Sequence, residues 1–337
     1  MNILFAGTPQ LAAPALRELA EQFSVVGVLT APDRASGRGR KVTPPPVRTT
    51  AEELGLPVLQ PPRLDEDARA AVRNLGPDML VSFAYGKIFG PKFMGLFEEG
   101  GINVHPSLLP KYRGPSPIPA VILAGEEETG ITVQYISQKM DAGAIVTQER
   151  IGLSAGETTH TLTGRVAARA GTILVDALRR IEAGTAQPVA QDEEEATYCK
   201  LIRKEDGRID WELPAGRIER MVRAYVPWPG AYTYWDGRKL TIWEAVAEPE
   251  GKTQHEGAAA DRADPAAGSS RSVASDLDAD PEEPGRVLAV DTGRGILIQT
   301  GSGVLAVRRL QLQAGKAVDW KSFVNGHADV TEAVLGG

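Results

Sequence analysis

The stretch that decides the fold reads GINVHPSLLPKYRG at residues 101–114, and MDAG follows it at residues 140–143. Side chains alternate along a strand, so Asn103 and His105 are predicted to share one face. One helix and one strand fit before Asp141 and would return its carboxylate beside the imidazole. An amide donor, an imidazole and a carboxylate can polarise a carbonyl group, move a proton and orient the base. This stretch therefore predicts a strand end that carries catalytic side chains.

The residues before this stretch alternate between strand and helix patterns. Apolar strands are predicted at 3–6, 25–29, 58–60, 79–83 and 102–105, and helices at 11–23, 44–54 and 65–75. The helix at 44–54 is expected to have Thr43 as its N-cap and Pro44 at its first position. Such alternation predicts a doubly wound, mostly parallel α/β sheet. Ligands of these sheets bind beyond the carboxyl ends of the strands, where Asn103 and His105 lie.

The pattern then changes toward a second domain. Further strands are predicted at 131–136 and 144–149, and a long helix at 158–183. Residues 187–200 have little apolar periodicity and are interpreted as a linker. The sequence thus predicts a catalytic domain at 1–186.

A β-rich domain is predicted at 201–318. Residues 198–246 contain four of the five tryptophans, and Asp236-Gly237 between two strand-like runs indicates a hairpin. Further strands are expected at 285–290, 295–300 and 303–312. Short strands joined by turns favour a small, OB-like β-barrel. Residues 319–337 are interpreted as a C-terminal tail.

The composition excludes several classes of protein. No run approaches the roughly 18 apolar residues of a membrane span, and the N-terminus does not resemble a signal peptide. A single cysteine, Cys199, excludes an internal disulfide framework and a Cys-rich zinc site. Only four histidines are present, so we expect no metal centre. The sequence predicts a cytoplasmic protein without a membrane anchor.

The negative charge of the chain is concentrated in one segment. Residues 247–285 contain ten acidic and three basic residues, and this net of −7 equals that of the whole chain. The other 34 acidic and 34 basic residues cancel, so a polyanionic partner remains compatible with local basic clusters. The segment lacks aromatic residues and is predicted to be a disordered acidic insertion in the second domain.

The motifs resemble those of formyltransferases that use 10-formyltetrahydrofolate. Asn-x-His, Ser-Leu-Leu-Pro and Asp-x-Gly occur in that order within residues 103–143. The resemblance implies a formyltransferase-like variant of the Rossmann fold, with Asn103, His105 and Asp141 as catalytic residues. It assigns the folate to two loops, which comprise Ser107, Leu108, Leu109 and Pro110, and Phe83, Ala84, Tyr85, Gly86 and Ile88. The N-terminal strand lacks Gly-x-Gly-x-x-Gly, which disfavours a nicotinamide dinucleotide.

A basic loop extends the resemblance to the methionyl-tRNA formyltransferases. The run PDRASGRGRK at 32–41 is similar to the loop with which that family enters the acceptor stem, and arginines among glycines suit phosphate binding. Ile209-Asp210-Trp211 and Pro227-Trp228-Pro229-Gly230 resemble the start of the family's C-terminal domain. The chain departs at 247–285, and mildly at 114–117, where Gly-Ala-Ala-Pro is usual. Contacts with tRNA are expected from Arg34, Arg38, Arg40, Lys41, Lys204, Arg220 and Arg223.

The resemblance implies formylation of methionyl initiator tRNA by a monomeric enzyme, with 10-formyltetrahydrofolate as the second substrate. Three alternatives remain: formylation of a sugar nucleotide or another small amine, hydrolysis of the formylfolate by the same catalytic residues, and a non-catalytic RNA-binding module. The basic loop and the C-terminal domain disfavour the small amine, and the intact catalytic trio disfavours the binding module.

Overall fold

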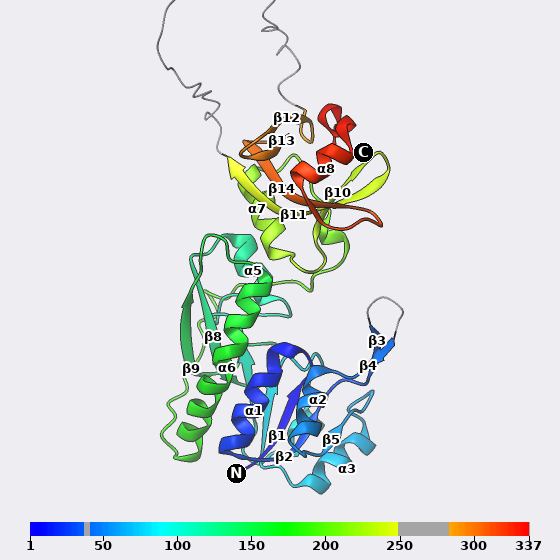
Figure 1. The fold of residues 1–337 in the computed structure, drawn as a ribbon. Helices are drawn as coiled ribbons and strands as arrows, with labels where there is room; N and C mark the ends of the chain where they lie inside the picture. The colour runs from blue at the N-terminus through cyan, green and yellow to red at the C-terminus, as the bar shows by residue number, and fades with distance from the viewer. Residues whose placement is uncertain (37–40, 249–282, 337) are drawn as a thin grey trace, which may run out of the picture. The chain divides into compact units, whose positions relative to one another are not determined.

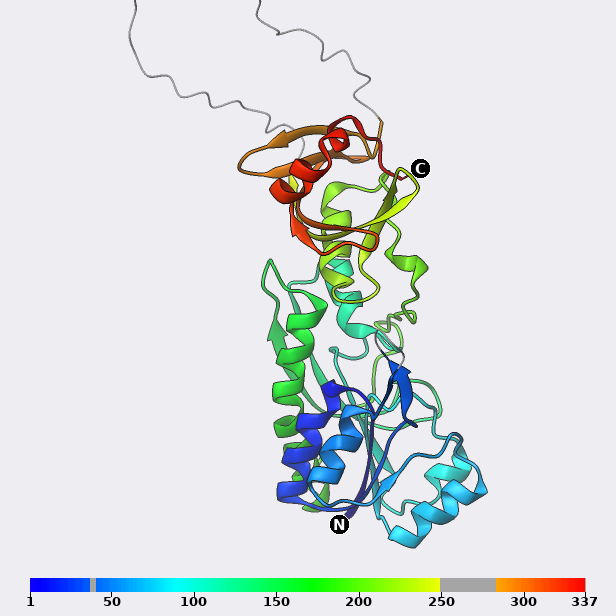
Figure 2. The same ribbon diagram turned by 45° about the vertical axis from the view of Figure 1, so that its right-hand side comes forward.

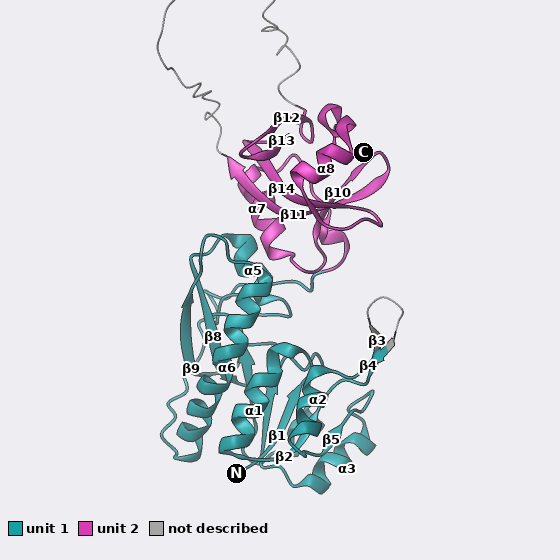
Figure 3. Ribbon diagram, in the orientation of Figure 1, with its two compact units in different colours: residues 1–202 teal, residues 203–337 magenta. Residues whose placement is uncertain are grey.

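The computed structural model describes residues 1–36, 41–248 and 283–336. The chain divides into two compact units, residues 1–202 and residues 203–337 (Figure 3). The first unit contains a seven-stranded sheet in the order β5-β2-β1-β6-β7-β8-β9 (Figure 1). The strands are β1 (Asn2–Gly7), β2 (Ser24–Leu29), β5 (Val58–Leu59), β6 (Met79–Phe83), β7 (Gly101–His105), β8 (Glu128–Tyr135) and β9 (Ile145–Gly152).

The sheet changes direction at β7. Strands β5, β2, β1, β6 and β7 are parallel, whereas β8 pairs antiparallel with β7 and with β9. The central strands β1 and β6 are almost entirely buried. Such burial on both faces explains why they form continuous apolar runs in the sequence.

The helices of the first unit are α1 (Ala13–Gln22), α2 (Pro46–Glu53), α3 (Glu66–Leu75), α4 (Pro91–Met94), α5 (Pro117–Ala124) and α6 (Thr159–Glu182). Helices α1, α2, α3 and α6 lie within two residues of the predicted ranges, whereas no range was predicted for α4 and α5. Helices α1 and α6 lie side by side (Figures 1 and 2). Asp65 caps α3 by accepting a hydrogen bond from the main chain of Ala68, and Thr158 forms a capping box at α6.

The predicted start of the helix at 44–54 is wrong. Helix α2 begins at Pro46 with Pro45 as its N-cap, and Thr43 ends the short strand β4 (Lys41–Thr43), which pairs with β3 (Arg34–Ser36). The cause is the run of three prolines at 44–46. A residue that precedes proline is disfavoured from helical backbone angles, so only the last proline of the run can open the helix.

Residues 187–200, which we expected to form a linker, lie in the first unit. Val189 pairs with Ile145 at the start of β9, and Tyr198 forms a bridge with Arg113. Polar side chains and main-chain groups attach this segment, so it lacks the apolar periodicity that sequence analysis detects.

The second unit is an antiparallel β-domain with one longer helix, α7 (Ala215–Ala224). Its strand order is β10-β11-β14-β13-β12, with β15 beside β14. The strands are β10 (Ala231–Trp235), β11 (Arg238–Glu248), β12 (Val287–Asp291), β13 (Gly295–Gln299), β14 (Val304–Leu312) and β15 (Val318–Asp319). The predicted hairpin is confirmed: Asp236 and Gly237, with φ of 50° and 67°, join β10 to β11.

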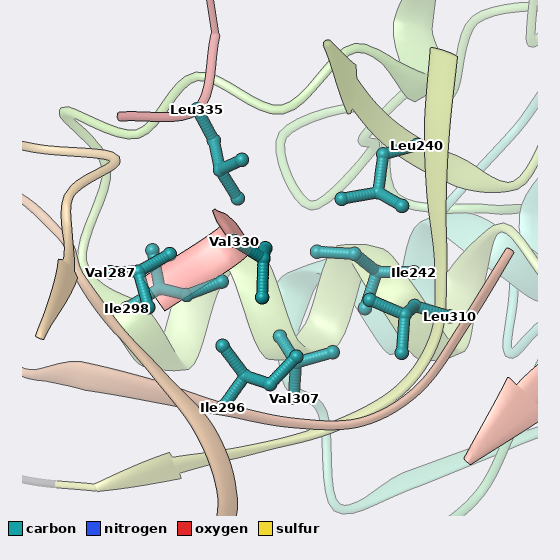
Figure 4. Close-up of a pocket in the computed structure, with 9 residues that line it drawn as sticks. All are labelled: Leu240, Ile242, Val287, Ile296, Ile298, Val307, Leu310, Val330 and Leu335. Carbon is teal, nitrogen blue, oxygen red and sulfur yellow. The ribbon is translucent and has the colours of Figure 1, made fainter. Parts of the chain in front are cut away.

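Residues after β15 complete the core of this unit. They form α8 (Trp320–Gly326) and a 3₁₀ helix (Ala328–Glu332). Val330 and Leu335 are buried among apolar side chains of β11 to β14 (Figure 4). The segment that we interpreted as a tail therefore contributes to the core.

The acidic insertion is shorter at both ends than the predicted range of 247–285. Ala247 and Glu248 pair with β14, and the main-chain N–H of Gly285 donates to Gln299. Residues 249–282, the rest of the predicted insertion, lie outside the described residues. Among the helices that the structure describes, none is long and apolar enough to span a membrane.

Candidate active site

The site begins at the carboxyl end of β7. His105 is the last residue of this strand and pairs with Thr132 of β8, and Asn103 pairs with Gln134. The two-residue spacing places Asn103 and His105 on the same face of the sheet, as predicted. His105 is only 4% exposed, whereas Asn103 is partly exposed. The imidazole therefore lies behind an amide that solvent can reach.

Two acceptors flank the imidazole of His105. Its Nε2 lies 2.9 Å from the carbonyl oxygen of Tyr112, and its Nδ1 lies 3.6 Å from Oδ2 of Asp141. A carbonyl oxygen only accepts, so this contact assigns the proton to Nε2 and leaves Nδ1 toward the carboxylate. Burial lowers the pKa of His105, while the Asp141 charge and the Tyr112 carbonyl oppose that shift. The neutral ring can thus accept a proton at Nδ1.

Asp141 is held by its neighbours in an unusual conformation. Its φ of 51° is in the left-handed region, which non-glycine residues seldom adopt. Its Oδ2 accepts a hydrogen bond from the N–H of Gly114 at 2.9 Å, and its Oδ1 accepts one from Nε2 of Gln134 at 3.2 Å. The carboxylate is therefore fixed beside the imidazole. Because Gln134 lies opposite Asn103, the fold brings the three predicted catalytic residues to one region.

The loop of Ser107 to Pro110 is fastened to β8 and β9. The Thr132 hydroxyl donates to the carbonyl of Ser107 at 2.6 Å and accepts from the N–H of Leu109 at 3.2 Å. Gln148 donates to the carbonyl of Leu109 at 2.8 Å. Ser107 and Leu109 are buried, while Leu108 and Pro110 are half-buried. Three main-chain groups of this loop, which the resemblance assigns to the folate, thus have protein partners.

The second predicted folate loop follows β6. Ala84 and Gly86 have φ of 52° and 85°, so the chain turns sharply around Tyr85. The Thr8 hydroxyl donates to the carbonyl of Tyr85, and Lys87 donates to the carbonyls of Pro61 and Pro62. The ring of Tyr85 stacks on Phe89, and burial raises the pKa of its hydroxyl to about 12.

The ends of this second loop differ in exposure. Phe83 is fully buried, whereas Ile88 is 78% exposed. The protein's own contacts thus fix the loop, and Ile88 is the predicted folate residue with the most surface free for a ligand.

Three residues of the site were not predicted. Arg113 is fully buried and donates to Oε1 of Gln191, and the amide of Gln191 binds the carbonyl of Asp141 and the side chain of Gln134. Arg113 lies inside the quoted stretch, where a charged residue in an otherwise rigid loop could have drawn attention. Nothing in the sequence pattern marks Gln191.

The predicted tRNA-binding residues belong to different parts of the chain. Arg34 begins β3 and is exposed, and Lys41 begins β4 in the same hairpin. Arg38 and Arg40 lie outside the described residues. In the second unit, Lys204 is exposed, Arg220 lies on α7, and Arg223 forms an ion pair with Glu219 at 2.6 Å. Within the described residues, no group of three His, Cys, Asp or Glu side chains could hold a metal ion.

Comparisons with known proteins agree with this arrangement. A family described as formyl transferase matches residues 1–178, and a formyl transferase C-terminal domain matches residues 201–328. The chain is 43% identical to the methionyl-tRNA formyltransferase of Treponema denticola over 98% of both proteins. It is 46% identical to that of Chloroflexus aggregans over 74% of this chain and 81% of the relative.

Solved structures show the same fold at lower identity. A methionyl-tRNA formyltransferase from Clostridium thermocellum matches with a TM-score of 0.52 at 17% identity, covering 74% of this chain and 94% of that one. HypX from Aquifex aeolicus, solved in complex with tetrahydrofolic acid, matches with a TM-score of 0.59 at 18% identity. That match covers 96% of this chain and 46% of HypX.

Proposed function

The chain belongs to the methionyl-tRNA formyltransferase family, and from this premise we propose that it transfers the formyl group of 10-formyltetrahydrofolate to the amino group of methionyl initiator tRNA. The products are formylmethionyl-tRNA and tetrahydrofolate. The observation that carries the proposal is the pairing of His105 with Asp141 at the end of β7, in a chain similar to these enzymes over its full length. Enzymes of this class act in translation initiation.

The proposed reaction begins when the methionyl amine attacks the formyl carbon. A C–N bond forms, and the carbonyl oxygen becomes an oxyanion that the Asn103 amide stabilises by donating a hydrogen bond. The attacking nitrogen loses a proton to Nδ1 of His105, beside Asp141. The bond from the formyl carbon to N10 of the folate then breaks, and the proton passes to N10.

The neutral imidazole supports this assignment of His105. Burial lowers its pKa, and Nε2–H is already bonded to Tyr112. A neutral ring can take a proton from an amine, whereas an imidazolium cannot. Once protonated, the ring carries a positive charge that Asp141 stabilises at 3.6 Å. The buried His105 and the partly buried Asp141 thus act together, one as the base and the other as the group that stabilises its charge.

We further propose that the basic hairpin of β3 and β4 and the second unit bind the tRNA. Arg34 and Lys204 are exposed, and arginine and lysine side chains bind phosphates without regard to sequence. We also propose that the protein is cytoplasmic and monomeric. Light scattering of the purified chain would test the monomeric state.

The proposed function is tested by the choice of acceptor. Purified protein is mixed with 10-formyltetrahydrofolate and either methionyl initiator tRNA, the same tRNA uncharged, a dTDP-amino sugar, or buffer alone. We expect release of tetrahydrofolate and formation of formylmethionyl-tRNA only with the charged tRNA. Comparable turnover with the amino sugar or with buffer would replace the proposal with one of the alternatives. Binding of tRNA without turnover would make the chain a binding module.

A further inference from the structure

The turn that carries Asp141 is held by a side chain from the segment interpreted as a linker. Nε2 of Gln191 donates to the carbonyl oxygens of Asp141 at 2.9 Å and Gly143 at 2.8 Å, and to Oε1 of Gln134 at 3.0 Å. Gln134 in turn donates to the carboxylate of Asp141. A left-handed non-glycine residue persists only where its surroundings hold it. Gln191 is therefore connected to both the backbone and the carboxylate of Asp141.

Arg113 fixes the orientation of the Gln191 amide. Its Nε and Nη2 lie 3.0 and 2.9 Å from Oε1 of Gln191. Guanidinium groups only donate, so the amide oxygen must face Arg113 and the NH₂ group must face the carbonyls. The guanidinium of the fully buried Arg113 also donates to Glu193 at 2.9 Å and to the hydroxyl of Tyr198 at 3.2 Å.

We propose that Gln191, oriented by Arg113, is a positioning residue that holds the Asp141 carboxylate beside Nδ1 of His105. The proposal rests on the proposed function, because it concerns the same reaction. Misplacing a catalytic group by about 1 Å can cost about 100-fold in rate. The competing explanation is that Gln191 only attaches residues 187–200 to the first unit.

The charged and titratable groups near His105 determine how its pKa responds to a substitution at position 191. The carboxylate of Asp141 and the carbonyl of Tyr112 face the ring directly. The thiol of Cys199 lies near the carbonyl of Tyr112, and burial raises its pKa. Beyond Gln191, Arg113 is paired with Glu193. A displaced Asp141 carboxylate would no longer oppose the effect of burial, so the pKa of His105 would fall further.

Two variants and one control test the positioning role. Gln191→Met keeps the length of the side chain and removes its hydrogen bonds. Gln191→Glu keeps an oxygen that can accept hydrogen bonds from Arg113. It replaces the NH₂ group, which donates to the carbonyls of Asp141 and Gly143, by an oxygen that cannot donate. Gln187→Glu adds the same charge at an exposed position of the same segment and is the matched control.

The measurements are kcat, KM for the formylfolate, the melting temperature and the titration of His105 by ¹⁵N NMR, in a chain with four histidines. Both Gln191 variants are expected to lower kcat at least about tenfold while KM changes less than about twofold. Gln191→Met should also lower the pKa of His105, because the Asp141 charge that raises this pKa moves away from the ring. Gln187→Glu should match the wild-type protein in kcat and in the His105 titration.

The proposal is overturned if folded Gln191→Met keeps wild-type kcat, or if activity falls only in proportion to the loss of folded protein. An unchanged His105 titration in folded Gln191→Met would also overturn it. If the wild-type protein does not formylate methionyl-tRNA, the proposed function fails. The titration of His105 in Gln191→Met then still tests the positioning role by itself.

Discussion

At the scale of single residues, the site depends on a histidine that is buried between two acceptors. The main-chain carbonyl of Tyr112 accepts a hydrogen bond from Nε2, and Asp141 faces Nδ1. Burial favours a neutral ring, which supports the proposed roles of Asn103 as the oxyanion donor and of His105 as the base.

Removing any one of the three catalytic groups should lower turnover far more than binding. We expect Asn103→Ala, His105→Gln and Asp141→Asn each to reduce kcat by about 10²- to 10³-fold, the usual loss for one transition-state contact. Folate affinity, measured by fluorescence titration, should stay within about threefold. A variant that keeps wild-type kcat would remove that residue from the mechanism.

The buried imidazole also predicts how stability depends on pH. The folded-state pKa of His105 is lowered, so below a pH of about 6.5 the unfolded chain binds a proton that the folded chain does not. Stability is therefore lost as the pH falls from about 6.5 toward the folded-state pKa. Urea unfolding at about pH 8 and about pH 5.5 should show a smaller difference for His105→Gln than for the wild-type protein. Equal differences would mean that His105 is not the group responsible.

At the scale of elements, the sequence predicted the strands and helices of the first unit well, because their apolar patterns are continuous. The start of α2 was missed because steric limits before proline override the N-cap preference of Thr43. Asn103, His105 and Asp141 were predicted from their spacing and from the family resemblance, and the structure brings them to one region. Gln191 could not be found, because its contacts are made by one side chain with polar groups of a turn fifty residues away.

The turn between β8 and β9 predicts the effect of one added methyl group. A Cβ at Gly143 would lie 1.7 Å from the carbonyl oxygen of Tyr135, so Gly143→Ala must displace the turn that holds Asp141. We expect a lower melting temperature and a loss of kcat. Gly164→Ala within α6 is the control, since a Cβ there meets no atom within 4 Å and alanine favours a helix by about 1 kcal/mol. Wild-type behaviour of folded Gly143→Ala would contradict the steric argument.

The proposed role of the hairpin of β3 and β4 predicts how tRNA binding depends on salt concentration. Replacing Arg34, Arg38, Arg40 and Lys41 by alanine should raise KM for charged tRNA without changing folate affinity. Each phosphate contact that is lost should lower the slope of log affinity against log salt by about 0.7–0.9. Arg73→Ala on α3 serves as the control, because its exposed arginine lies outside the proposed tRNA-binding residues. An unaltered slope in the variant with all four substitutions would mean that the hairpin does not contact phosphates.

At the scale of the whole molecule, the insertion lies between the last residue of β11 and the first residue of β12, which are at the same end of the second sheet. Glu248 pairs with Val304, which also pairs with Gln299, and the neighbouring Ile298 pairs with Val287. Three strand spacings thus separate β11 from β12, about 14 Å. A linker of about eight residues can span this distance.

Replacing residues 249–282 with such a Gly/Ser linker should leave folding and turnover nearly intact. The replacement removes eight acidic and three basic residues, a net charge of −5. Less like-charge repulsion should strengthen tRNA binding at low salt, an effect that disappears at high salt. The melting temperature and kcat/KM for charged tRNA check this expectation. A large loss in either would show that the segment has a function of its own.

The burial of Val330 and Leu335 has a consequence for biosynthesis. Every strand and helix of the first unit precedes residue 203, so this unit can fold while the ribosome is still translating the second. The second unit lacks two apolar side chains of its core until Leu335 has left the exit tunnel. This core therefore cannot close before then, and a nascent chain stalled before Val330 would carry a folded first unit and an open hydrophobic surface that chaperones recognise.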